Sequence, residues 1–413
     1  MGTDRGAELR VLRESDWDRW YDVLYRAFGA SAAPPEEREL NRSLTEFDRS
    51  LAAWDGDEVV GTTGAFSFRM TVPGGSAVPA AGVTMVSVAA THRRRGVLTS
   101  MMRRQLDDVR ALGEPLAVLT ASEPAIYGRF GYGAATFRTT AEIDTSRVTL
   151  SLPPGVADVR LRYAAPADVL DACEAVYAAL VPQRPGMLAR QPGWERAVLL
   201  DPESERDGAS ALQCVVAERD REVTGYARFT TRTGWGESGH DGTVQLKDLA
   251  AIDPVTEAAL WRFLCGIDLM TTLSVRSRPV DDAWRYLVSD TRRCRPRLRD
   301  DAYVRLVDVG TALAARTYQA PVDVVLEVED AFCPWNAGRW RLTGDAKGAS
   351  CARTYDTAEL SLSVRELGAS YLGGVTLLSL AAAGRVRELR PGALTEASVA
   401  FGSPVAPWLP HGF

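Results

Sequence analysis

Lysine is almost absent from this chain of 413 residues: only Lys247 and Lys347 occur, and arginine supplies nearly all of the 48 basic residues. A run of arginines is therefore expected from composition alone and does not by itself indicate a phosphate-binding site. The formal net charge is −6. This charge argues against a general nucleic-acid binder and mildly favours cationic partners.

Histidines and paired cysteines are also scarce. The three histidines, His92, His240 and His411, lie far apart in the sequence, which argues against a zinc site or a serine–histidine triad. The six cysteines form no C-x-x-C pair, and such spacing is typical of reduced core thiols rather than of a disulfide framework. The sequence therefore predicts no bound metal, and acid–base chemistry has to come from other groups.

Long apolar runs are missing as well. No stretch of about 18 apolar residues occurs, and the first residues, Met1 to Glu8, lack the apolar core of a signal peptide. We therefore expect a cytoplasmic protein with no membrane partner. The content of 46% hydrophobic and 25% charged residues is that of a globular protein. The length suggests about three domains, since single cores rarely grow past roughly 250–300 residues.

The most informative stretch begins with an alternating strand at 83–88 and a basic loop that ends at Gly96. A helix is predicted over 97–112, where apolar residues recur with a helical period and Gly113 ends the pattern. A helix start offers unpaired N–H groups and a partial positive charge, which suit an anionic cofactor. A more basic run, 292–299, opens no glycine-led helix, and we expect it to be a surface connection.

An aromatic–glycine turn follows about thirty residues later. A buried strand at 116–121 leads to Ser122 and then to the turn at 125–133. Tyr127 in this turn is a candidate general acid, because a phenol with a pKa near about 10 is protonated at neutral pH and can protonate a thiolate with a pKa of about 8.5. The alternative is that Tyr127 and Tyr132 are packing aromatics, which is the role we expect for Tyr132.

Three segments together resemble the Eis-type (enhanced intracellular survival) acetyltransferases of the GNAT superfamily: Thr91–Gly96, Ala121–Glu123 and Ile126–Gly133. In the first segment, Arg93 and Gly96 match the GNAT loop pattern Arg/Gln-x-x-Gly-x-Gly/Ala, whereas Leu98 replaces its last small residue. The resemblance covers the whole chain. It implies an α/β fold of tandem GNAT-like domains followed by a sterol-carrier-like domain.

The resemblance also implies a cosubstrate, acetyl-CoA, and assigns its contacts. Its pantetheine arm would lie along a splayed strand and its pyrophosphate at the helix start. The implied binding residues are Val86, Ser87, Val88, Arg94, Arg95, Gly96, Val97, Leu98, Thr99, Ser122 and Glu123. By the same resemblance Tyr127 is the general acid. The terminal carboxylate of Phe413 is the general base, and it would be ionised because an α-carboxyl has a pKa of about 3.5.

The implied domain limits are 1–150 for the catalytic GNAT domain, 151–300 for a second GNAT-like domain and 301–413 for the sterol-carrier-like domain. An internal repeat favours the second domain, because residues 215–229 echo 53–66. Chance similarity between two α/β segments is the alternative.

The second copy differs from the first at the helix start. Residues 244–254 and the predicted helix 255–265 echo the strand, loop and helix of the first copy, but Asp253 and Glu257 stand near the start of this helix. Carboxylates there would repel a pyrophosphate, and Pro254 has no N–H to donate. We therefore expect no cofactor in the second domain.

The leading interpretation is an acetyl-CoA-dependent N-acetyltransferase that acts on small cationic amines. By resemblance these are aminoglycosides or other polyamine-like molecules, modified at one or several amino groups, and the family links this activity to antibiotic resistance and to homohexamers. The alternatives are a protein lysine acetyltransferase, a longer-chain N-acyltransferase and a lipid-binding regulatory protein built around the last domain.

Overall fold

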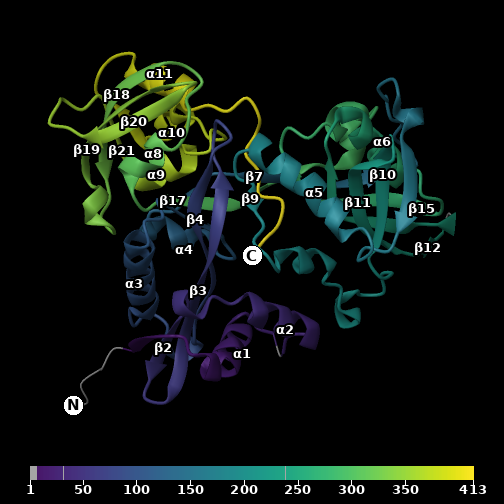
Figure 1. The fold of residues 1–413 in the computed structure, drawn as a ribbon, viewed down its shortest axis with the longest axis horizontal. Coiled ribbons are helices and arrows are strands. Elements are labelled where there is room, and N and C mark those ends of the chain that lie inside the picture. Colours follow the sequence, from purple (N-terminus) through teal and green to yellow (C-terminus); the bar gives the residue numbers. More distant parts are fainter. Residues whose placement is uncertain (1–6, 31, 238) are drawn as a thin grey trace. The chain divides into compact units, whose positions relative to one another are not determined.

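The computed structural model describes residues 7–413 apart from residues 31 and 238 (Figure 1). Most of the segment on which the signal-peptide prediction rests, residues 1–6, lies outside the described residues. The chain divides into two compact units. One contains Met1–Thr136, Asp301–Pro404 and Gly412–Phe413, and the other contains Phe137–Asp300 and Val405–His411. The domain limits at 150 and 300 stay a prediction.

The first unit contains a mixed sheet with the strand order β1-β2-β3-β4-β5-β17-β6. Neighbouring strands on this path are antiparallel except β4 and β5, which run parallel. The strands are β1 (Glu8–Val11), β2 (Leu51–Asp55), β3 (Glu58–Thr71), β4 (Ala77–Val88), β5 (Leu116–Thr120), β6 (Gly133–Ala134) and β17 (Ala302–Leu306). The helices of this part are α1 (Trp17–Ala27), α2 (Pro35–Leu44), α3 (Val97–Ala111) and α4 (Pro124–Tyr127).

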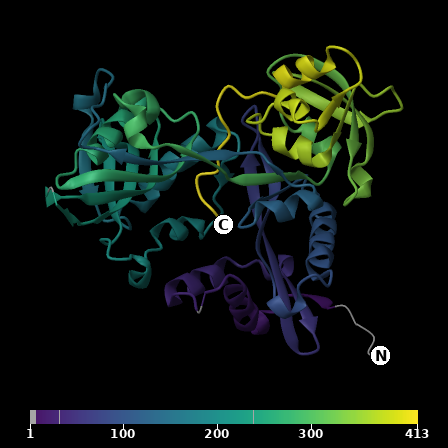
Figure 2. The same ribbon diagram turned by 180° about the vertical axis from the view of Figure 1, so that it is seen from behind.

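Helices α1 and α3 cover opposite faces of this sheet (Figures 1 and 2). The faces follow from strand alternation, because successive side chains point to opposite sides. Ala52 and Val59 pack in the cluster of α1, whereas Ala53 and Val60 pack in the cluster of α3. The sheet therefore lies between two helical layers.

The helix and strand predicted for this part from the sequence are present, but their ends differ from the predicted ones. The predicted helix 97–112 is α3, and the strand predicted at 83–88 is the last half of the longer strand β4. Helix α2 ends at Leu44, and a single 3-10 turn, Phe47–Arg49, follows. The break is at Thr45, whose hydroxyl bonds the Asn41 carbonyl and accepts from the Trp17 indole.

The second unit contains a sheet with the order β16-β7-β15-β14-β11-β10-β8. Its strands are β7 (Phe137–Asp144), β8 (Arg160–Ala164), β10 (Gln213–Arg219), β11 (Glu222–Arg232), β14 (Gly242–Ala251), β15 (Met270–Pro279) and β16 (Arg297–Asp300). The second unit also contains three short strands and three helices. They are β9 (Leu188–Ala189), β12 (Trp235–Gly236), β13 (Gly239–His240), α5 (Leu170–Leu180), α6 (Pro254–Cys265) and α7 (Trp284–Leu287).

The internal repeat is visible in the two sheets. In the second unit, β11 and β14 are antiparallel, β14 and β15 are parallel, and α6 connects the parallel pair. In the first unit, β3 and β4 are antiparallel, β4 and β5 are parallel, and α3 connects them. The same supersecondary unit therefore occurs twice.

The basic run 292–299 is not the plain surface connection that we expected. After a 3-10 turn at Thr291–Cys294, residues Arg297–Asp300 form strand β16, which pairs antiparallel with β7 at the edge of the sheet. The arginines remain exposed, and charged side chains on an edge strand discourage pairing with another chain. Charge alone thus did not reveal the backbone pairing.

The last part of the first unit has a sheet of its own, ordered β20-β19-β18-β21-β22. Its strands are β18 (Val322–Glu329), β19 (Gly338–Asp345), β20 (Gly348–Arg353), β21 (Leu360–Ser363) and β22 (Val386–Glu388). Its helices are α8 (Val309–Ala314), α9 (Val364–Ser370), α10 (Leu377–Ala382) and α11 (Ala393–Ala400).

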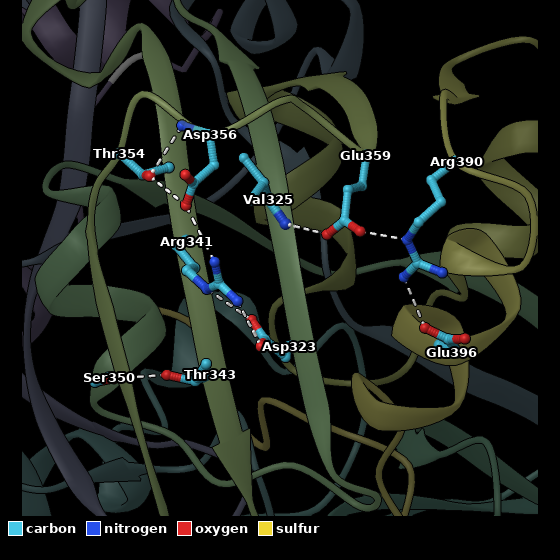
Figure 3. A network of polar contacts seen from close by, with 10 residues as sticks. All are labelled: Asp323, Val325, Arg341, Thr343, Ser350, Thr354, Asp356, Glu359, Arg390 and Glu396. Atoms are coloured by element: carbon cyan, nitrogen blue, oxygen red, sulfur yellow. Dashed lines mark hydrogen bonds and ion pairs between the residues drawn. The ribbon is translucent and has the colours of Figure 1, made fainter.

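Arginine–carboxylate pairs link neighbouring strands and loops of this last sheet (Figure 3). Arg341 on β19 bonds Asp323 on β18 at 2.7 Å and Asp356 at 3.0 Å. Arg390 bridges Glu359 and Glu396 in the same way. These groups are solvent-exposed, so the pairs add little stability each.

Candidate active site

Strand β4 separates from β5 partway along its length. The two strands pair only where Ala80, Ala81 and Gly82 face residues 116–118. Within the described residues, β4 continues from there to Val88 without β5 beside it. The strand therefore has an open edge along Thr84–Val88, where backbone N–H and C=O groups can pair with an extended ligand.

A β-bulge marks the same stretch of β4. The register between β3 and β4 shifts between Thr62 and Gly64, and Met85 on the opposite strand has a φ of 53°. Thr62 Oγ1 donates to the Met85 carbonyl at 2.7 Å and lies 2.7 Å from Ser87 Oγ. The Ser87 hydroxyl is therefore occupied inside the sheet. Val86 and Val88, predicted to present their backbone, lie on this open stretch.

The basic loop ends at an uncapped helix start. Gly96 precedes α3 in the left-handed conformation, with a φ of 81°, and no side chain caps the helix. A Cβ on Gly96 would meet nothing within 4 Å. In the described part of the chain no side chain caps the first-turn N–H groups of residues 97–99, and Arg94 and Arg95 beside them are exposed. This arrangement fits a diphosphate.

The corresponding helix of the second unit is closed to an anion. The Asp253 carboxylate accepts from the N–H groups of Val255 at 2.9 Å and Thr256 at 3.0 Å. Pro254 provides no N–H at all. The donors that are free at α3 are therefore either occupied or missing at α6.

Tyr127 lies at the end of α4, directly after the predicted contacts Ser122 and Glu123, which are exposed. Its ring packs on the same apolar cluster as Val86 and Leu98, so the turn, the open strand and the start of α3 share one core. Burial, together with the Glu123 carboxylate, raises the pKa of Tyr127 above its ordinary value of 10.0. The phenol is therefore protonated at neutral pH, as a general acid must be.

Tyr132 has the packing role that the sequence predicts. It is fully buried, and its ring lies edge-on to that of Tyr127 with 6.1 Å between centroids. Burial raises its pKa far above the ordinary value. Among the described residues, its hydroxyl has no hydrogen-bond partner.

Phe413, the last residue, packs against strand β4 and its neighbour β3. Thr84 Oγ1 donates to the Phe413 carbonyl oxygen at 3.0 Å, and the Phe413 ring is 5.1 Å from that of Phe68 in an edge-on contact. Thr84 stands where β4 has just left β5. The chain terminus therefore reaches the beginning of the open edge.

Three residues around the terminus were missed by sequence reasoning: Phe68, Gly82 and Thr84. A Cβ on Gly82 would lie 2.5 Å from the Phe68 ring and 3.2 Å from the Phe413 ring, so only glycine fits. Glycine inside a strand is a known sign of close approach by another group, and this was the one available signal. Nothing in the local sequence marks Thr84 or Phe68.

The described residues, 7–413 without 31 and 238, contain neither a candidate metal site nor a candidate membrane-spanning helix. No group of three or more histidine, cysteine, aspartate or glutamate side chains is arranged to hold a metal ion. None of the helices in these residues is long and apolar enough to cross a membrane.

Family profiles match three successive regions of the chain. The profile described as an acetyltransferase (GNAT) domain matches residues 8–135, and another with the same description matches residues 186–306. A sterol carrier protein domain matches residues 309–410. The predicted fold of two GNAT domains followed by a sterol-carrier-like domain is confirmed.

Full-length relatives give the same result. An uncharacterized N-acetyltransferase of Streptomyces coelicolor is 76% identical over 410 residues, which cover 98% of this chain and 99% of the relative. The N-acetyltransferase Eis of Mycobacterium tuberculosis is 33% identical over 409 residues, covering 95% and 96%. The crystal structure of Eis1 from Mycobacterium abscessus matches with a TM-score of 0.84 and 33% identity, over 98% of this chain and 100% of that one. The chain therefore belongs to the Eis-type N-acetyltransferases of the GNAT superfamily.

Proposed function

We propose that this N-acetyltransferase transfers the acetyl group of acetyl-CoA to amino groups of small cationic, polyamine-like molecules. The observation that carries the proposal is the position of the chain end: Phe413 bonds Thr84 at the point where β4 opens. A carboxylate and an open strand edge are thereby brought together. GNAT acetyltransferases use acetyl-CoA, which supplies the acetyl group as a thioester.

The chain offers a fitting surface for this cosubstrate. The backbone of Val86 and Val88 on the open edge would pair with its amide groups, with Ser87 fixing the strand through Thr62. The N–H groups of Gly96, Val97, Leu98 and Thr99 would bind its diphosphate, with added charge from Arg94 and Arg95. Ser122 and Glu123 would complete the contacts at the end of β5. The second GNAT domain lacks such a surface because Asp253 occupies its helix start.

Two groups of the chain would move the protons. The Phe413 carboxylate would accept a proton from the substrate ammonium group, directly or through water, so that the amine becomes a nucleophile. Tyr127 would donate its proton to the sulfur that leaves the acetyl group. The raised pKa of Tyr127 keeps it in the donating form.

The substrate class is proposed from charge and kinship. The net charge of −6 suits polycations, and a relative at 33% identity is named N-acetyltransferase Eis. We propose aminoglycosides or similar polyamines, a cytoplasmic location and a homo-oligomeric, hexameric assembly. No nucleic acid or membrane takes part in the proposed reaction.

The test is an assay of thiol release from acetyl-CoA with a panel of aminoglycosides, polyamines and lysine-containing peptides. The proposal expects turnover with the polyamine-like amines and product masses that increase by one or more acetyl groups. Turnover with lysine peptides alone would contradict the proposed substrate class. No turnover with any amine, together with tight lipid binding, would contradict the proposed function.

A further inference from the structure

The aromatic–glycine turn that carries Tyr127 rests on the C-terminal domain. Within the first unit, strand β6 of the turn pairs with β17, and helix α9 packs on both strands. Phe130 of the turn contacts Phe332 edge-on at 5.0 Å between ring centroids. The acid of the proposed reaction is thus supported by residues more than 170 positions later in the chain.

Three glycines bring the turn close to this support. A Cβ on Gly133 would lie well inside 3.0 Å of the Arg365 carbonyl oxygen and the Ala369 nitrogen, both backbone atoms of α9. A Cβ on Gly131 would overlap the Arg305 guanidinium and lie 2.9 Å from Val364. A Cβ on Gly128, next to Tyr127, would lie 2.8 Å from the Arg365 guanidinium. At Gly133, where the opposing atoms belong to the backbone, the turn can lie this close to α9 only because no Cβ is present.

Helix α9 has the complementary glycine. A Cβ on Gly368 would overlap the Val304 carbonyl oxygen of β17 and lie 3.3 Å from the Gly133 nitrogen. Gly368 therefore lets α9 approach β17, the strand that pairs with β6 of the turn, and at Gly133 the helix meets the turn backbone against backbone. At Gly133 and Gly368 the nearest atoms to an added Cβ are all backbone atoms, so no flexible side-chain end can shift to make room for it.

Helix α9 is itself held firmly in its own domain. Ser363 caps its start by accepting from the Arg365 N–H, and the Ser363 hydroxyl donates to the Glu366 carboxylate. Glu366 also pairs with Arg385. Most of the helix is buried. A rigid helix pressed on a turn sets the position of that turn.

Tyr132 couples the position of the turn to the position of Tyr127. Tyr132, between Gly131 and Gly133, donates its backbone N–H to the Tyr127 carbonyl at 3.3 Å. Its buried ring forms the edge-on contact with the Tyr127 ring. A shift of the turn relative to α9 would therefore move the Tyr127 phenol.

We infer that helix α9 of the sterol-carrier-like domain positions the catalytic turn, and that Gly368 is the positioning residue at their contact. This inference rests on the proposed role of Tyr127 as general acid. It gives the C-terminal domain a part in acetyl transfer that needs no lipid. A displacement of about 1 Å at a reacting group can cost on the order of 10²-fold in rate.

The test is Gly368→Ala in the full-length protein, with Gly310→Ala as the matched control. Gly310 is a glycine of α8 in the same domain, where a Cβ would lie 2.7 Å from the Trp340 ring, away from the turn. Both changes introduce one methyl group into a crowded helix contact, and alanine is the better helix former. We expect kcat to fall about 10- to 100-fold in Gly368→Ala, the KM for acetyl-CoA to stay within about twofold, and Gly310→Ala to keep the wild-type kcat.

A double-variant cycle separates positioning from general damage. If Gly368 acts through Tyr127, Gly368→Ala should cause no further loss in a Tyr127→Phe background. Losses that multiply would overturn the inference, as would a wild-type kcat in Gly368→Ala. Tyr127→Phe with wild-type kcat would instead remove the proposed acid, so the two failures are distinct.

Two further measurements test the inference if Gly368→Ala folds poorly or if no substrate of the protein is found. Val364→Ala, which removes packing from the Gly131 side, should lower kcat several-fold in the same way. Hydrogen exchange of residues 124–133 needs no substrate: it should speed up in Gly368→Ala and Val364→Ala but not in Gly310→Ala. Unchanged exchange in this segment in all three variants would contradict the inference.

Discussion

Thr84 and Phe413 are 329 residues apart in sequence, yet the Thr84 hydroxyl donates to the terminal carbonyl oxygen at 3.0 Å. The bond fixes the chain end at the position where strand β4 leaves β5. A hydrogen bond to a charged group contributes about 1.5–3 kcal/mol. The terminal residue is thus held by a specific contact as well as by its ring.

Thr84→Val is expected to lower kcat about tenfold, because the carboxylate loses the donor that orients it while the shape of the side chain is kept. Thr84→Ser, which keeps the hydroxyl, is the control and should stay near wild type. Steady-state rates at saturating acetyl-CoA measure both. Equal rates in the two variants would show that this bond has no part in turnover.

The local patterns of the sequence were sufficient for the elements but not for their distant contacts. The apolar period of residues 97–112 predicted α3 because a helix buries one face whatever lies beyond it. The edge strand at 297–300 was missed because its pairing with β7 depends on a partner about 160 residues earlier. Arginine side chains on that strand gave no alternating signal.

The candidate site divides in the same way. Gly96, Val86 and Tyr127 were identified from motifs within fifty residues of each other, and the structure places Val86 and Tyr127 on one cluster. The contact of Phe413 with Thr84 and Phe68 could not be found from spacing, and only the family resemblance indicated the terminus. Gly133 and Gly368 likewise have meaning only in the fold, because Gly133 makes room for the backbone of α9 and Gly368 makes room for the Val304 carbonyl of β17.

Tyr127→Phe is expected to bind acetyl-CoA normally and to lower kcat roughly 10²–10⁴-fold, the usual effect of losing one general acid. In the proposed mechanism the rate requires the protonated phenol, so we expect it to be retained at neutral pH and lost only as the pH rises through a pKa above the ordinary value of 10.0. A pH–rate profile checks this. If the fall in rate at alkaline pH persists unchanged in Tyr127→Phe, the alkaline limb of the pH–rate profile belongs to another group.

Charge reversal at the α3 loop should weaken cofactor binding. In Arg94→Glu/Arg95→Glu we expect the KM for acetyl-CoA to rise at least tenfold, because two carboxylates replace two cations beside the helix start. Arg297→Glu/Arg299→Glu on the exposed edge strand β16 makes the same change in net charge elsewhere and should leave KM unchanged. Calorimetric titration should give one CoA per chain; a second site would contradict the closed helix start at Asp253.

Arg305 and Asp330 form a buried ion pair at 2.5 Å, with side chains 0% and 1% exposed. Arg305→Ala leaves Asp330 without its cation in the interior, and we expect the free energy of unfolding to fall by about 3–5 kcal/mol. Arg341→Ala, which breaks the exposed pairs with Asp323 and Asp356 (Figure 3), should lower the free energy of unfolding far less, because solvent screens these charges. Denaturant unfolding of the two variants measures the difference, and equal losses would contradict the burial argument.

Amidation of the C-terminus is the most direct test of the proposed base. It removes the negative charge of Phe413 and keeps the aromatic ring that packs on Phe68. The amide still offers a carbonyl oxygen to Thr84, so the chain end should stay in place while it loses the ability to accept a proton from the substrate. We therefore expect an amidated, correctly folded protein with nearly normal affinity for acetyl-CoA and a kcat reduced about 10²–10⁴-fold.

A short C-terminal tag should have a similar or larger effect on kcat, because it moves the carboxylate away from β4, whereas an N-terminal tag should have little effect. The unmodified rate should also fall as the pH drops through the pKa of the carboxyl group, since only the ionised form accepts a proton, and this acid limb should vanish in the amide. Equal values of kcat for the N-tagged, C-tagged and amidated proteins would exclude Phe413 from the reaction and leave its contact with Thr84 a purely structural one.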